Sequence, residues 1–122
     1  MRIEKGTYEE YVKLYGDSPL ALNIKDNKCD LYFLYKYDEL IDKIVVFTEE
    51  RNLVNLNICL RPFKEYLEYT ICFLLSRYSN IILELDENAY GKEIFNTIRS
   101  KYKAATLPNN HELSRLGLRI VK

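Results

Sequence analysis

Apolar residues recur at helical spacing near the start of the chain. Four of them stand three or four positions apart: Tyr8, Tyr11, Val12 and Tyr15. Thr7 precedes this run and Glu10 stands three residues after Thr7, which is the arrangement of a capping box. Because Gly16 is placed to end a helix, we expect a short helix between Thr7 and Gly16.

The spacing of apolar residues changes to two from Leu20 onward. Leu20, Leu22 and Ile24 alternate with small or polar residues, so this segment is predicted to be a strand. Three further runs, rich in aromatic and β-branched residues, predict strands over residues 31–37, 40–48 and 53–60. Because short polar turns separate these runs, we expect an antiparallel meander.

The second half of the chain alternates helix and strand. Helical spacing predicts a helix over residues 62–78, and residues 81–85 form a short apolar strand. Asp86 or Asn88 is placed to cap a second long helix, and residues 116–121 are predicted to be a terminal strand. A strand, a helix and a strand in this order predict a crossover between parallel neighbours.

These elements predict the α+β fold class. We expect a mixed, mostly antiparallel sheet with a β-meander and a β-α-β crossover, covered by helices on both faces. A chain of 122 residues has the usual size of one domain, and the sequence shows neither an internal repeat nor a linker. Residues 1–122 are therefore predicted to form a single domain.

The charges of the chain balance, with 18 Lys and Arg against 18 Asp and Glu. Zero formal net charge disfavours nucleic acid or an anionic membrane as the partner. Residues 88–122 carry seven Lys and Arg against two Glu, and we interpret this local surplus as a solvated helix face.

Two observations bear on where the protein works. No stretch approaches the ~20 apolar residues that span a bilayer, and the first five residues lack the apolar core of a signal peptide, so we expect no membrane partner and a cytoplasmic location. Cys29, Cys59 and Cys72 are odd in number, widely spaced and set among apolar residues. They are predicted to be reduced thiols packed in the core.

Several common chemistries lack the residues that they need. His111 is the only histidine, and the three scattered cysteines provide no ligand pairs at zinc spacing, so no metal site is expected. His111 is also the only base for a Ser-His-Asp or Cys-His site, and the cysteines have apolar neighbours. No Gly-rich phosphate loop occurs, which disfavours nucleotide hydrolysis and dinucleotide binding.

The chain resembles the GNAT family of N-acetyltransferases over roughly residues 31–103. The order of meander, helix, strand, helix and terminal strand is similar to that family, and Asp38–Ile44 resembles its hairpin segment. Val54–Leu60, followed by Arg61 and Pro62, resembles its fourth strand and the proline beyond it. The best local match runs from Leu83 to Phe95, where Asn88, Gly91 and Phe95 fall at the family's spacings.

The resemblance implies an acetyl-CoA cleft flanked by residues 56–60 and by Asn88, with Ile58, Leu60 and Asn88 as cofactor-binding residues. The family binds the cofactor pyrophosphate in a Gly-rich turn before the central helix, because glycines let phosphate oxygens approach the amides there. Residues 62–70 contain no glycine, and Glu65 and Glu68 would place negative charge beside a diphosphate. Binding of acetyl-CoA in the family's usual manner is therefore disfavoured.

The catalytic residues of the family are also not matched. Phe95 stands where the family commonly has a tyrosine that protonates the leaving thiolate, and phenylalanine has no proton to give. Tyr90 and Tyr102 are the candidate substitutes. The candidate general bases lie on or beside predicted strands: Glu49, Glu50 and Glu84.

Three functional hypotheses remain. The preferred one is a non-catalytic or weakly catalytic GNAT-like domain that acts by binding a protein or a small ligand. The second is an acyl-CoA-dependent N-acetyltransferase. The third is an unrelated α+β binding protein of the inhibitor or immunity type, which predicts no splayed parallel strands at Ile58 and Leu83. The tyrosines of residues 31–37 leave two arrangements open: an uncovered face that could form a homodimer, or cover by helices on both faces.

Overall fold

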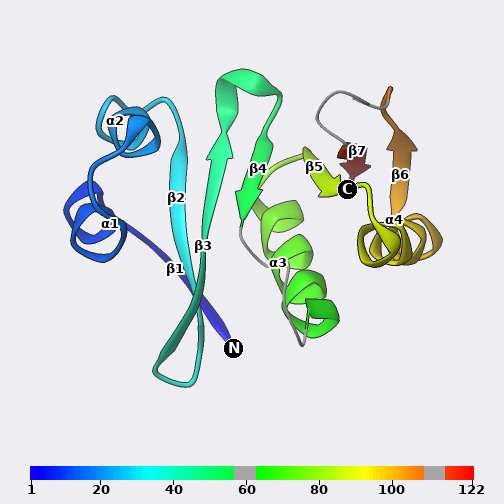
Figure 1. The fold of residues 1–122 in the computed structure, drawn as a ribbon, viewed down its shortest axis with the longest axis horizontal. Helices are drawn as coiled ribbons and strands as arrows, with labels where there is room; N and C mark the ends of the chain where they lie inside the picture. The colour runs from blue at the N-terminus through cyan, green and yellow to red at the C-terminus, as the bar shows by residue number, and fades with distance from the viewer. Residues whose placement is uncertain (57–62, 109–114) are drawn as a thin grey trace.

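The computed structural model describes residues 1–56, 63–108 and 115–122. Figure 1 shows their arrangement. The elements follow in the order β1 (Arg2–Lys5), α1 (Tyr8–Tyr15), α2 (Pro19–Lys25), β2 (Asp30–Lys36), β3 (Glu39–Phe47), the 3₁₀ turn η1 (Thr48–Glu50), β4 (Leu53–Leu56), α3 (Phe63–Arg77), β5 (Asn80–Asp86), α4 (Ala89–Lys101), β6 (Lys103–Thr106) and β7 (Arg115–Val121).

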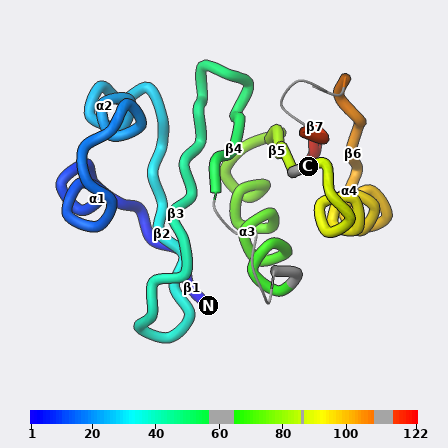
Figure 2. The backbone as a smooth tube through the Cα atoms, in the orientation of Figure 1, coloured from blue at the N-terminus to red at the C-terminus, as the bar shows by residue number. Residues whose placement is uncertain are grey.

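One seven-stranded sheet runs through the molecule in the order β1-β2-β3-β4-β5-β7-β6. Its neighbouring strands are antiparallel except for β4 and β5, which run parallel and are connected through α3. This confirms the predicted fold class, a mixed and mostly antiparallel sheet with a meander and a β-α-β crossover. Figure 2 follows the chain from α1 and α2 at one end of the sheet to α4 and β6 at the other.

Two apolar cores lie on opposite faces of the sheet, because successive residues of a strand point to opposite sides. On one face, Leu34 of β2, Val46 of β3 and Leu83 of β5 pack with α3 and α4. On the other face, Phe33 of β2 and Val45 of β3 pack with α1 and α2. Helices therefore cover both faces of β2 and β3, as predicted.

The prediction of a strand over residues 20–24 is wrong, because this segment belongs to α2. The Ser18 hydroxyl accepts a hydrogen bond from the Ala21 amide at 3.1 Å, and Pro19 occupies the first turn, where its missing N–H costs nothing. Ala21 and Ile24 are buried while Leu22 is 57% exposed, so the inward residues follow helical spacing. The alternation of Leu20, Leu22 and Ile24 therefore does not reflect a strand. Ser18 and Pro19 are the local signals that indicate the helix.

The sequence pattern missed β1 and β6, which form the two edges of the sheet and have four residues each. Their side chains are mostly exposed, so they lack the apolar alternation that identifies a half-buried strand. The capped helix after Thr7 and the strands at residues 31–37, 40–48, 81–85 and 116–121 are confirmed within a residue or two. The strand expected over residues 53–60 is present to Leu56, and its remainder lies outside the described residues.

The tyrosine-rich strand β2 is paired on both edges, with β1 and with β3. Tyr32 is buried, Tyr35 is half-buried, and Tyr37 in the following turn is 83% exposed. Of the two arrangements left open by the sequence, the structure shows cover on both faces.

In the part of the chain that the structure describes, no helix is both long and apolar enough to cross a membrane.

The close approach of Gly6 to the core gives a test of this packing. A Cβ at Gly6 would lie 2.4 Å from Cε2 of Phe33, whose side chain is 1% exposed. We expect Gly6→Ala to lower the free energy of unfolding by about 1–3 kcal/mol, measured by urea denaturation. Gly117→Ala is the matched comparison, because its Cβ would lie 3.2 Å from Leu107, beside an edge loop, and should cost less. Equal stability of Gly6→Ala and the wild type would contradict the packing.

Candidate functional site

The parallel strands β4 and β5 part soon after they meet. They pair at Leu53 with Ile82 and at Val54 with Leu83, and no further pair joins them among the described residues. β5 continues to Asp86 while paired to β7 on its other side. The pairing of β4 with β5 therefore ends, among the described residues, on the side where the acyl-CoA cleft was expected. Ile58 and Leu60 lie outside the described residues.

The start of the parallel pair is fixed by Asn52, which adopts the left-handed conformation with φ 63°. Its side-chain Nδ2 donates to the Asn80 carbonyl at 2.9 Å, and its own carbonyl accepts from the Ile82 amide at 3.1 Å. Asn tolerates this backbone region better than most residues. The two hydrogen bonds tie the turn before β4 to the beginning of β5.

Asn88, the third predicted cofactor-binding residue, is the N-cap of α4. Its Oδ1 accepts a hydrogen bond from the Gly91 amide at 2.7 Å, which satisfies one of the free N–H groups at the helix start. Gly91 is buried. The carboxamide oxygen therefore has a structural role in the described fold.

The acidic residues near the start of α3 form ion pairs with lysines of other elements. The Glu65 carboxylate lies 3.8 Å from Nζ of Lys36 on β2, and Glu68 pairs with Lys101 on α4. All four side chains are partly exposed to solvent, so each pair contributes little to stability. Glu65 lies in the first turn of α3, where its charge opposes the binding of an anion.

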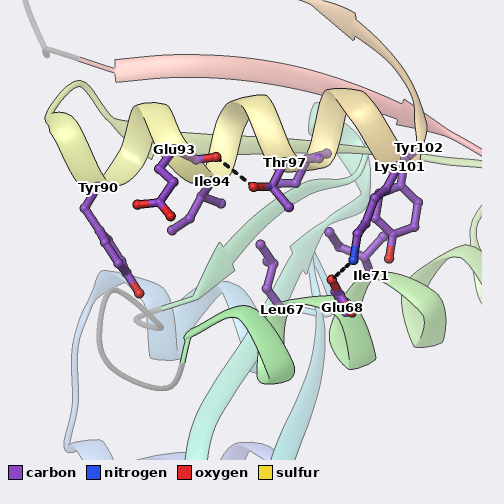
Figure 3. A pocket seen from close by; sticks show the side chains of 10 residues that line it. Leu67, Glu68, Ile71, Tyr90, Glu93, Ile94, Thr97, Lys101 and Tyr102 are labelled. Carbon is purple, nitrogen blue, oxygen red and sulfur yellow. Dashed lines mark hydrogen bonds and ion pairs between the residues drawn. The ribbon is translucent and has the colours of Figure 1, made fainter.

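A groove of about 70 Å³ separates α3 from α4, and Figure 3 shows the side chains that line it. Its floor is apolar and comes from both helices: Leu67, Ile71, Ile94 and Ile98. Its rim is polar: Glu68, Tyr90, Glu93, Thr97, Lys101 and Tyr102. The ion pair between Glu68 and Lys101 bridges the two helices at one end.

The two tyrosines proposed as substitutes for a catalytic phenol are both at this groove. Tyr90 is 40% exposed in the first turn of α4. Tyr102 follows the last turn of α4 as the C-cap and is partly buried against the core. Burial, together with the Cys72 thiol 3.9 Å away, raises the pKa of Tyr102 to about 12, so its phenol stays protonated at neutral pH. Phe95 is half-buried, with the Arg99 guanidinium 5.7 Å from its ring centre.

Among the described residues, no helix belongs to the core on the opposite face of the sheet beyond β3. There, a hollow of about 330 Å³ lies against β5 and β7, and it brings together two of the candidate general bases, Glu50 and Glu84, with Arg115. Apolar or small residues complete it: Leu53, Ile82, Leu107, Pro108 and Gly117. Glu84 is half-buried, and its partner across the strands is Gly117, which has no side chain to cover it. The third candidate base, Glu49, is exposed in η1 and does not line the hollow.

Lys43 is a buried cation on this same face, and the sequence analysis missed it. Its side chain is placed beside Phe33 on β2, it is 5% exposed, and its Nζ donates to Oδ1 of Asn55 on β4 at 2.8 Å. Burial lowers the pKa of Lys43, although the nearby Asp42 carboxylate acts in the opposite direction. The sequence contains one sign of this buried cation, because Asp42 and Lys43 stand together in a strand of mostly apolar residues.

The two described cysteines differ in environment. Cys29 is buried, and burial with a smaller contribution from Asp30 raises its pKa to about 11, which makes it an inert thiol. Cys72 is exposed on α3, so its prediction as a core thiol is wrong. Cys59 and His111 lie outside the described residues, within which no cluster of three metal-ligating side chains occurs.

Comparisons of the chain with protein-family models, with curated proteins and with solved structures gave no match.

The burial of Lys43 can be tested by removing its charge. Lys43→Met keeps the length of the side chain, and we expect it to raise the free energy of unfolding at pH 7 by about 1 kcal/mol, because no ammonium is then taken out of water. Urea denaturation measures the change, and Lys28→Met, at an exposed turn position, is the control. A loss of stability in Lys43→Met would show that the ammonium supports the fold.

The raised pKa of Cys29 predicts a pH dependence of stability. Between pH 9 and 11 the unfolded thiol ionises while the folded thiol keeps its proton, so the folded state loses stability as the pH rises. We expect the stability of the wild type relative to Cys29→Ala to fall by about 2 kcal/mol across this interval, measured by urea denaturation at each pH. Cys29→Ser should give the same slope as Cys29→Ala. A relative stability that does not change with pH would contradict the buried thiol.

Proposed function

We propose that the chain is a GNAT-like domain that binds a protein or a small ligand and transfers acyl groups weakly or not at all. The observation that carries the proposal is the α3 segment that would receive a cofactor pyrophosphate. Residues 62–70 contain no glycine, and Glu65 occupies the first turn of α3. A carboxylate at a helix N-terminus occupies the electrostatic position that a bound phosphate would need.

The arrangement of the sheet supports the GNAT-like part of the proposal. The chain passes from a meander into a helix, a parallel strand, a second helix and terminal strands, which is the order on which the resemblance rests. The central parallel pair opens after Val54 and Leu83. An unrelated α+β binding protein would not require this opening.

A cytoplasmic location belongs to the same proposal. Cys29 and Cys72 are both free thiols, and a reducing compartment keeps thiols in this state.

The alternative is an acyl-CoA-dependent N-acetyltransferase, and the open face of the sheet favours it. Glu84 lies half-buried in a hollow beside the parallel pair, where a carboxylate could accept a proton from an amine. In this alternative Tyr90 or Tyr102 would supply the proton for the leaving thiolate.

Isothermal titration with acetyl-CoA and CoA separates the two functions. The binding hypothesis predicts no detectable heat of binding up to millimolar cofactor, because the Glu65 carboxylate opposes a diphosphate at the first turn of α3 and residues 62–70 contain no glycine. Glu65→Gln should bind CoA no more weakly than the wild type, and Glu39→Gln, at an exposed acid that begins β3, is the control. Micromolar binding of acetyl-CoA, with transfer of acetyl to an amine that is lost in Glu84→Gln, would replace the proposal by the alternative.

A further inference from the structure

The groove between α3 and α4 has the features of a ligand site that does not suit an anion. Its four floor residues belong to the core and are each less than a tenth exposed, so the slot is narrow and apolar. Ligand sites combine an apolar surface of this kind with a few placed polar groups. Here, the rim provides two carboxylates, Glu68 and Glu93, against one ammonium, Lys101.

The charges at the two ends of the groove differ. At one end Lys101 forms its ion pair with Glu68, so the positive charge there is balanced. At the other end Glu93 projects from α4 on the same side as Tyr90 (Figure 3), and the Glu93 carboxylate makes no ion pair with any residue that the structure describes. The backbone carbonyl of Glu93 accepts from the Thr97 hydroxyl at 2.9 Å, and the Glu93 side chain lines the groove.

We propose that this groove binds a small aliphatic amine, with the ammonium between Glu93 and Tyr90 and the alkyl chain along the floor. A carboxylate and an aromatic ring side by side attract a cation, through charge and through the face of the ring. At the opposite end the Glu68 carboxylate is already paired with Lys101, which sets the direction of the ligand.

The spacing of Glu93 and Thr97 sets the length of the chain. The two residues are four positions apart on α4, which is a rise of roughly 6 Å. A linear chain of about five carbons spans this distance. The ligand class is an unbranched primary amine of this length, and its affinity should be modest because the site is small.

This inference rests on the proposed function, since it assigns the small ligand of the binding domain. The groove does not suit CoA as its ligand, because CoA carries phosphates and the rim of the groove has a surplus of negative charge.

The test compares three probes that have the same number of carbons but differ in charge: n-pentylamine, 1-pentanol and pentanoate. Each is titrated into ¹⁵N-labelled protein and followed by NMR chemical-shift changes. We expect the amine to bind in the millimolar range with shifts at Leu67, Ile94 and Thr97, the alcohol to bind about fivefold more weakly, and pentanoate to bind least. Equal binding of amine and alcohol, or shifts that map elsewhere, would overturn the proposal.

Two variants of the protein test which residue binds the ammonium of the ligand. Glu93→Gln keeps the shape of an exposed side chain and should reduce amine binding about fivefold, to the level of the alcohol. Glu39→Gln is the matched control and should leave amine affinity unchanged. Unchanged amine binding in Glu93→Gln would contradict the assignment of the ammonium.

An acetyl-transfer assay with n-pentylamine and acetyl-CoA separates the failure of this inference from the failure of the proposed function. Acetylated pentylamine would overturn the binding function while the amine site holds. Absence of amine binding, together with absence of acetyl-CoA binding, would overturn the amine site and leave the binding function in place.

Discussion

The short parallel contact between β4 and β5 joins the two halves of the sheet. The other strand pairs are antiparallel, whereas β4 reaches β5 only after the chain has passed through α3. Two register pairs and the hydrogen bonds of Asn52 make this contact, and the buried side chains of α3 pack with Leu83 beneath it. Because the contact is so short, β4 and β5 can diverge beyond it. The opening in the sheet is thus a consequence of how the halves are joined.

The two faces beside this junction differ in chemistry. On the helical face, the groove between α3 and α4 is apolar with an acidic surplus, and Glu65 lies in the first turn of α3. On the open face, Glu50, Glu84 and Arg115 surround a shallow hollow, and the buried Lys43 lies farther along with Asn55.

Strong local signals allowed most of the fold to be predicted. The capping box of Thr7 and the Asn88 cap each define a helix start, because the side chain that accepts the hydrogen bond is visible in the sequence. The segment at Leu20 was predicted to be a strand because three of its apolar residues alternate. It is a helix because Ser18 caps it and Pro19 starts it. The edge strands β1 and β6 escaped because exposed strands lack a periodic apolar face.

The candidate sites could be predicted only in part. Glu50 and Glu84 were named from their place beside strands, but their common hollow depends on Gly117, which pairs with Glu84 from a distant strand. The groove could not be predicted, because it depends on the distance between α3 and α4. The apolar residues of each helix indicate only which side of that helix faces inward. Lys43 and Asn55 meet across two strands whose register no local pattern sets.

The character of the edge strands limits how the protein can associate. β1 and β6 are each four residues long and carry exposed cationic side chains, with Arg2 held over the Tyr35 ring and Lys103 at the start of β6. Short, charged edges are poor templates for strand addition, in which a foreign peptide extends a sheet through main-chain hydrogen bonds. The sheet is thereby protected against edge-to-edge growth, and recognition is left to its faces and grooves.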